Sequence, residues 1–131
     1  MANQIVQFKD EYSNNIFPKE PGIFQSITLT DTDFSPRNLI VLIRGQIGIV
    51  SANIRPLSAS VLPLNTEVTL GTIQAGWRPN ANMMYLCPNQ DMSDIYLIQI
   101  KTTGEITIMA TKTGGKTTFI RGAFPYVITV E

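Results

Sequence analysis

Ala110–Thr117 is the segment of this chain that comes nearest to a known chemical motif. Its sequence, ATKTGGKT, fits the phosphate-binding pattern Gly-x-x-x-x-Gly-Lys-Ser/Thr except that alanine stands at the first glycine. The pattern binds phosphate when the loop follows a parallel strand and opens a helix, whose first backbone amides hold the anion. Here the next residues, TFIRGAFP, are strand-like and end in a proline. We therefore expect a glycine-rich hairpin turn with solvated lysines, and no nucleotide site.

Two pairs of acidic residues lie in loop-like sequence, Asp31 with Asp33 and Asp91 with Asp94. Paired carboxylates can hydrolyse glycosides or bind calcium, but neither pair has the ligand series of a calcium loop. Capping of turns is the alternative role for these side chains. Asn89 adds polar groups beside the second pair. This loop is therefore compatible with hydrogen bonding to sugar hydroxyls.

The chain contains no histidine and one cysteine, Cys87. Nucleophilic catalysis of the Ser-His or Cys-His type lacks its base, and a His/Cys metal site cannot form within one chain. Cys87 ends the apolar run MMYLC, which favours a small buried side chain in a strand over a reactive thiol. We expect neither an enzyme nor a bound cofactor or metal ion.

Trp77 is the only tryptophan, and Arg78 and Pro79 follow it. An exposed indole can support a sugar ring and an arginine can hold a polar group, but a tryptophan beside a proline can equally pack at the edge of a β-sandwich. We favour packing. A ligand-binding pocket would need further aromatic and polar side chains, for which Tyr85 is a candidate. The candidate ligand contacts are Trp77, Arg78, Tyr85, Asn89, Asp91 and Asp94.

The composition indicates one domain that associates with other protein surfaces. The 131 residues are enough for a single domain. Hydrophobic residues make up 44% of the chain and charged residues only 15%, below the roughly 25% usual for soluble domains. We therefore expect partner subunits to cover some apolar surface. The ten basic and ten acidic residues cancel without a basic block, which argues against nucleic acid as a partner.

Neither a secretory signal nor a membrane span is predicted. The first nine residues, MANQIVQFK, lack the long apolar run of a signal peptide. The longest apolar stretch, Leu39–Ile43, is far too short to cross a bilayer. We expect a soluble protein made in the cytoplasm, with no membrane insertion.

Alternating apolar residues and short turns predict an all-β fold throughout. The clearest element is a hairpin in which Ile95–Ile100 turns at Lys101–Gly104 into Glu105–Thr111, with glycine supplying the positive φ of a tight turn. The other expected strands are Gly22–Leu29, Leu39–Ile43, Gln46–Ala52, Thr66–Thr72, Met83–Cys87, Thr117–Arg121 and Tyr126–Val130. About nine short strands at this spacing predict an antiparallel β-sandwich or jelly roll. We assign it to residues 22–131, preceded by an N-terminal arm or linker over residues 1–21.

Five segments of the sequence resemble parts of phage virion proteins. A strand, a Gly-aromatic-Arg-Pro corner and a Thr-Gly-Glu-Ile-Thr-Ile hairpin follow one another at Leu62–Ile73, Gly76–Asn80 and Thr103–Ile108. This order resembles the C-terminal domains of phage tail-fibre and baseplate proteins. The segments Gln4–Asp10 and Asn14–Lys19 are similar to the N-terminal arms of virion and prophage structural proteins.

The resemblance implies a homotrimeric β-sandwich head domain whose ligand is a saccharide or another component of the host cell surface. It also implies that the corner around Trp77 is mainly architectural, and it carries over no catalytic or ligand residue. Such domains usually end longer chains that carry a shaft, whereas this sequence begins with Met1 and a short arm. An excised domain and a short stand-alone fibre or decoration protein would both fit this difference.

We therefore expect a non-enzymatic virion protein of the tail-fibre, baseplate or head-fibre type that binds a host cell-surface glycan. Its other partners would be copies of itself and further virion proteins, bound through residues 1–21. The main alternative is a purely structural decoration or assembly protein without a host ligand. A bacterial lectin-like adhesin and an enzyme are the remaining alternatives.

Overall fold

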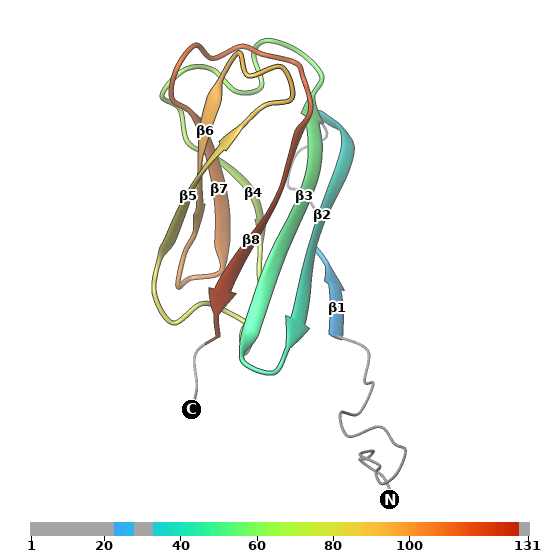
Figure 1. Ribbon diagram of the computed structural model, residues 1–131, viewed down its shortest axis with the longest axis vertical. Helices are drawn as coiled ribbons and strands as arrows, with labels where there is room; N and C mark the ends of the chain where they lie inside the picture. Colours follow the sequence, from blue (N-terminus) through green and yellow to red (C-terminus); the bar gives the residue numbers. More distant parts are fainter. Residues whose placement is uncertain (1–22, 28–32, 129–131) are drawn as a thin grey trace, which may run out of the picture.

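The computed structural model describes residues 23–27 and 33–128, which contain strands and no helix. Eight strands form two four-stranded antiparallel sheets that pack face to face (Figure 1). The predicted all-β class and antiparallel sandwich are confirmed. The strands are β1 (Ile23–Ser26), β2 (Phe34–Arg44), β3 (Ile47–Pro56), β4 (Val68–Thr72), β5 (Met83–Pro88), β6 (Ile95–Ile100), β7 (Glu105–Ala110) and β8 (Ile120–Val127). The predicted arm, residues 1–21, and the boundary at residue 22 lie outside the described residues.

The first sheet has the strand order β1-β2-β3-β8. β2 and β3 form its long central hairpin, which turns at Gly45 with a φ of 62°. Their residues alternate between the two faces, so that Val41 and its cross-strand partner Val50 are buried against the other sheet. This period of two is the signal that β-branched and aliphatic residues give in a half-buried strand.

The second sheet has the order β4-β7-β6-β5. β5, β6 and β7 are consecutive, and β4 lies beside β7, which is a Greek key arrangement. The predicted hairpin between β6 and β7 is confirmed, since Gly104 has a φ of 93° and the N–H of Lys101 donates to the carbonyl of Glu105 at 2.9 Å. In the first sheet β1, β2 and β3 form a simple meander. Of the two architectures expected, the strand order therefore supports the sandwich.

The C-terminal part of the prediction is wrong in one respect. Thr117–Arg121 and Tyr126–Val130 were expected as two strands, but one strand, β8, runs without a break from Ile120 to Val127. Pro125 lies inside it and pairs with Ile49. A proline is tolerated there because β8 is the last strand of its sheet, and an edge position does not require an N–H donor. The described residues thus contain eight strands where about nine were predicted.

The core lies between the sheets and consists mostly of aliphatic side chains, with two large buried tyrosines. Burying each aliphatic side chain contributes about 1.5–3 kcal/mol. Tyr126 on β8 is 2% exposed, and its hydroxyl donates to the carbonyl of Trp77 at 2.6 Å. Burial raises the pKa of Tyr126 to about 12. Its ring packs against the backbone of Gly48, where any side chain would overlap it. Within the described ranges, no helix has the length and apolar character needed to cross a membrane.

Candidate functional site

Three connections meet at one end of the sandwich, at the top of Figure 1. They are the β3–β4 connection (residues 57–67), the β5–β6 connection (residues 89–94) and the β7–β8 connection (residues 111–119). The β7–β8 connection includes most of the phosphate-motif-like segment and crosses from the second sheet to the first. The hairpin turn expected there is therefore wrong. The two glycines instead take left-handed conformations, with φ values of 73° at Gly114 and 70° at Gly115.

These glycines help the β7–β8 connection to wrap around a carboxylate. Asp94 is fully buried. Its Oδ1 accepts backbone N–H groups from Ile95 at 2.9 Å and from Lys112 and Thr113 at 3.1 Å each. Its Oδ2 accepts the N–H of Gly114 at 2.7 Å. Successive amides of this kind form an anion-binding nest, and here the chain's own aspartate occupies it.

The pKa of Asp94 lies below its ordinary value. Burial alone would raise the pKa of this carboxyl, but the backbone N–H groups that donate to it outweigh that effect. Asp94 therefore remains ionised in the folded protein at neutral pH. The motif-like segment binds an anion that belongs to the protein, which is a structural role.

Asn89 supports the same loop from within. It is 2% exposed, its Oδ1 accepts the N–H of Asp94 at 3.0 Å, and its Nδ2 donates to Ser93 Oγ at 2.9 Å. The turn that it holds includes Met92, which has a φ of 63°. Asn89 and Asp94, both predicted as ligand contacts, thus lie beneath the surface and fix the loop.

A cleft of about 410 Å³ opens beside this loop. It lies where the ends of β3 and β8 meet the β5–β6 connection. Its lining combines one aromatic ring, one guanidinium group, one carboxylate, one amide and two hydroxyls. The lining residues are Arg55, Gln90, Asp91, Thr117, Thr118 and Phe119.

The register of the first sheet explains how the aromatic and basic groups come together. Ile54 of β3 pairs with Ile120 of β8. Arg55 follows Ile54 and Phe119 precedes Ile120, so the antiparallel pairing brings Arg55 and Phe119 opposite each other. The Arg55 guanidinium carbon lies 5.5 Å from the centre of the Phe119 ring, and that of Arg121 lies 4.2 Å from it. Both are within the range of a cation–π contact.

Hydrogen bonds hold both guanidinium groups in place. Arg55 Nε donates to the carbonyl of Ser35 at 2.9 Å, and Arg121 Nε donates to Asn53 Oδ1 at 3.1 Å. The carbonyl of Phe119 accepts the N–H of Gln90 at 2.8 Å, which fixes the ring's backbone to the β5–β6 connection. The cleft is thus built on paired strands and a braced loop, a rigid base suited to binding.

Asp91 is the predicted contact that does line the cleft. Its Oδ1 accepts the hydroxyl of Ser93 at 2.6 Å and the N–H of Ser93 at 3.1 Å. The side-chain bond from Ser93 is the main cause that lowers the pKa of Asp91, and the charge of Lys116 adds to it. The carboxylate is ionised at neutral pH and can accept hydrogen bonds from a ligand.

Trp77 and Arg78 lie at the opposite end of the sandwich, in the connection between β4 and β5. Trp77 is partly buried and packs against the core. Arg78 Nε donates to the carbonyl of Ile73 at 2.9 Å, and its side chain lies against Gly104 in the β6–β7 turn. These contacts tie the corner to the neighbouring hairpin, in agreement with the architectural role implied for it, and place both residues away from the cleft.

Tyr85 lies on β5 at the side of the sandwich and is also outside the cleft. Its hydroxyl donates to the carbonyl of Pro125 on β8, and its ring packs on Phe124 with centroids 5.4 Å apart. Cys87, two residues along, is buried, and burial raises the pKa of its thiol. This edge of β5 therefore joins the two sheets.

Tyr85→Phe tests whether Tyr85 has only this structural role. The variant loses one hydrogen bond between the sheets, so we expect the free energy of unfolding to fall by about 1 kcal/mol. Urea denaturation measures this change. Ligand binding measured on the same sample should be unchanged, and a loss of affinity without a loss of stability would place Tyr85 in the binding site instead.

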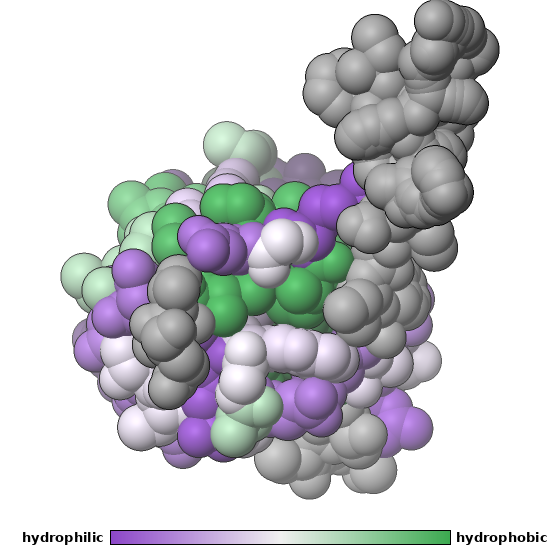
Figure 2. Space-filling view, turned by 90° about the horizontal axis from the view of Figure 1, so that it is seen from below, coloured by the Kyte–Doolittle hydropathy of each residue, from purple (hydrophilic) through white to green (hydrophobic). Residues whose placement is uncertain are grey.

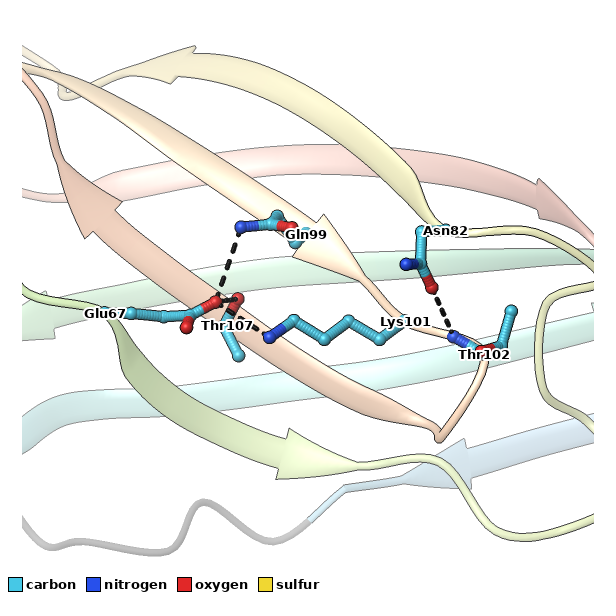
Figure 3. Close-up of polar contacts among 6 residues, drawn as sticks. All are labelled: Glu67, Asn82, Gln99, Lys101, Thr102 and Thr107. Carbon is cyan, nitrogen blue, oxygen red and sulfur yellow. Dashed lines mark hydrogen bonds and ion pairs between the residues drawn. The ribbon is translucent and has the colours of Figure 1, made fainter.

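The outer face of the second sheet carries a polar cluster that is separate from the cleft (Figure 3). Glu67 Oε2 lies 3.0 Å from Lys101 Nζ and accepts the hydroxyl of Thr107 at 2.8 Å. The hydrogen bond from Lys101 is the first cause that lowers the pKa of Glu67. Exposed ion pairs of this kind add little stability. The cluster links Glu67, just before β4, to Lys101, just after β6, and to Thr107 on β7.

Apolar side chains are also exposed at two places on the molecule. On the outer face of the second sheet, Leu86, Leu97 and Met109 form a cross-strand row, and Leu86 is 70% exposed. The end of the sandwich opposite the cleft also shows gathered apolar side chains (Figure 2). Ile47 and Val127, which pair across β3 and β8 and are 44% and 45% exposed, belong to this end. Both surfaces fit contact with other proteins.

A scan against protein-family models and a search of curated proteins found no match for this chain. In the part of the chain that the structure describes, no three His, Cys, Asp or Glu side chains are grouped so that they could hold a metal ion.

Sequence reasoning missed most of the cleft. Arg55, Phe119 and the two threonines gave no signal because each belongs to ordinary strand or turn sequence. Arg55 lies beyond the end of the expected strand Gln46–Ala52, and Phe119 lies in the middle of the expected strand Thr117–Arg121. Only the pairing of β3 with β8 makes them neighbours.

Proposed function

We propose that this chain is a non-enzymatic binding domain of a phage virion protein, of the tail-fibre, baseplate or head-fibre type, that binds a saccharide of the host cell surface. The observation that carries the proposal is the cleft of about 410 Å³, with the Phe119 ring, the Arg55 guanidinium and the Asp91 carboxylate on its lining. The sequence resemblance to phage tail-fibre and baseplate domains supports the choice of a virion protein.

The chemistry of the lining suits a sugar. The apolar face of a pyranose packs on an aromatic ring, while its hydroxyls need donors and acceptors that are fixed in place. Phe119 offers the ring, Gln90 offers both a donor and an acceptor, and Asp91 offers an ionised acceptor. The volume falls within the usual range of ligand pockets, about 300–1,000 Å³.

The same lining favours binding over hydrolysis. Glycosidases of the common type need two carboxyl groups on either side of the scissile bond. Among the described residues that line the cleft, Asp91 is the only carboxylate. The nearby Asp94 is buried and saturated by backbone N–H groups. This supports the proposal of a receptor-binding role and gives no support to an enzyme.

A single shallow cleft would bind a sugar weakly. Several linked copies would raise the effective concentration of sites without any new contact. A homotrimer on a virion, as the resemblance implies, would supply that multivalency. Such subunit contacts could use the apolar surface on the outer face of the second sheet or the one at the end of the sandwich opposite the cleft.

A microarray of bacterial surface polysaccharides, probed with the fluorescently labelled protein, tests the proposal. We expect selective binding that is lost in Gln90→Ala and Phe119→Ala. Arg37→Gln, at an exposed position in a different hollow of the first sheet, serves as the matched control and should bind as the wild type does. Thermal melting confirms that each variant is folded. The proposal fails if no polysaccharide binds, or if the folded cleft variants bind as well as the control.

A structural decoration protein without a host ligand is the second candidate. The apolar row of Leu86, Leu97 and Met109, of which Leu86 is 70% exposed, favours it, because such a row fits a protein surface better than a sugar. The two candidates are distinguished by two measurements: the mass of the particle in solution, from light scattering coupled to size exclusion, and glycan binding on the array. A stable particle of three times the 14.5 kDa monomer mass agrees with a trimeric receptor-binding head, whereas a monomer that binds no glycan agrees with a decoration protein.

A further inference from the structure

We propose that the saccharide bound in the cleft carries an anionic group, a carboxylate or a phosphate, and that Arg55 binds this group. The inference rests on the proposed function and adds the chemical class of the ligand. It gives the cleft a preference that its polar lining alone would not have. Local charge, the orientation of Arg55 and the state of Asp91 support this assignment.

Two positive charges gather at the Phe119 ring, although the whole chain is neutral. Arg55 lines the cleft, and Arg121 shares the Phe119 ring with it at 4.2 Å. Lys116 lies near enough to Asp91 for its charge to act on that carboxyl. Two guanidinium groups therefore meet at the Phe119 ring, which is part of the cleft lining. An anionic ligand would gain from this field and a cationic one would lose.

Arg55 is oriented in a way that leaves it able to bind. Its Nε donates to the carbonyl of Ser35 at 2.9 Å, which uses one of the five N–H groups of a guanidinium. That bond fixes the plane of the group beside the Phe119 ring. A guanidinium held in one plane can form paired hydrogen bonds to a carboxylate or phosphate, which are among the strongest in proteins.

Asp91 does not cancel this preference. Its carboxylate is already engaged by the hydroxyl and the N–H of Ser93, both at Oδ1. It lies on the β5–β6 connection, whereas Arg55 lies at the end of β3. A sugar with an anionic substituent on one side of its ring and hydroxyls on the other would place the anion against Arg55 and a hydroxyl against Asp91.

Titration of the protein with matched pairs of sugars, followed by backbone amide NMR, tests the inference. The pairs are methyl glucoside with methyl glucuronoside, methyl galactoside with methyl galacturonoside, and glucose with glucose 6-phosphate. Acetate and inorganic phosphate serve as ions without a sugar. We expect at least one charged sugar to shift the amides of Gln90, Thr118 and Phe119, with at least about tenfold higher affinity than its neutral partner or the bare ion.

Two variants give the matched comparison. Arg55→Gln should weaken binding of that charged sugar about tenfold and abolish its advantage over the neutral partner. Arg37→Gln, at an exposed arginine in a different hollow on the first sheet, should leave both affinities unchanged. Raising the salt concentration should weaken the binding of the charged sugar and leave the binding of the neutral sugar unchanged.

The outcomes separate the inference from the proposed function. Equal affinities for charged and neutral sugars would overturn the anionic ligand and leave saccharide binding in place. Equal binding of the bare ions would show an anion site that does not read a sugar, and would overturn the inference. If no sugar of either kind shifts the amide signals of the cleft residues, and no polysaccharide on the array binds, both proposals fail. Loss of binding in Arg37→Gln as well as in Arg55→Gln would assign the effect to overall charge.

Discussion

Replacing Asp94 by alanine is expected to lower the free energy of unfolding by about 3 kcal/mol, because an unmade hydrogen bond to a buried group costs about 1–3 kcal/mol. Four backbone N–H groups, three of them from the β7–β8 connection, lose their acceptor in this variant. The loss is smaller than the sum of four such bonds, since Lys112 and Thr113 are exposed and water can reach their amides.

Urea denaturation followed by circular dichroism measures the change. Asp91→Ala is the matched control, because it removes the same side chain from the same loop but at an exposed position. We expect the denaturation midpoint of the control to stay close to that of the wild type. Equal midpoints for the two variants would contradict the structural role given to Asp94.

The pH dependence of stability gives a second test of the hydrogen bonds that Asp94 accepts. The folded pKa of Asp94 lies below its ordinary value, so its ionised form is favoured by folding. Its contribution is fully present above the unfolded pKa, about 3.9, and is lost as the pH falls through the folded pKa. The difference in stability between the wild type and Asp94→Ala should therefore shrink in acid below about pH 4. A difference that does not change with pH would contradict this assignment.

Replacing Gly48 by alanine should cost about 3 kcal/mol, at the upper end of what overpacking a core usually costs. The added methyl group would overlap the ring of Tyr126, which is buried and held by its hydroxyl bond to Trp77. The ring cannot move away without breaking that bond or displacing the core. Thermal or urea unfolding measures the loss.

Gly45→Ala is the control for this prediction. Gly45 lies in the same hairpin, and an added methyl there meets nothing within 4 Å. Its cost comes only from the left-handed backbone, about 1–2 kcal/mol. A second check uses Tyr126→Leu as the background, in which Gly48→Ala should cost much less. If the cost is the same in both backgrounds, the ring of Tyr126 is not its cause.

The fold class could be predicted from the sequence because strand alternation and turn residues are local signals. The Ile95–Ile100 hairpin shows this well, since a glycine with positive φ and two apolar runs define it completely. β8 could not be predicted, because the tolerance for Pro125 depends on the strand being at the edge of the sheet. Edge position is a property of the whole topology.

The candidate site shows the same limit. Asp91 was found because polar loop residues are visible in a sequence. Arg55 and Phe119 were not found, because 63 residues separate them in the chain and only the β3–β8 register joins them. Asn89 and Asp94 have the residue types of a binding loop, yet they are buried. Type alone cannot distinguish a side chain that binds a ligand from one that fixes the loop beneath it.

The contact between Tyr85 and Pro125 limits how copies of this protein can assemble. Pro125 has no N–H to donate at the free edge of β8, and its carbonyl is already bonded to the Tyr85 hydroxyl. At Pro125 this edge thus offers neither a donor nor a free carbonyl to a strand from another molecule. Strand addition, the route by which open sheets polymerise into fibrils, is blocked there. Another copy that approaches this part of β8 must therefore make its contacts through side chains.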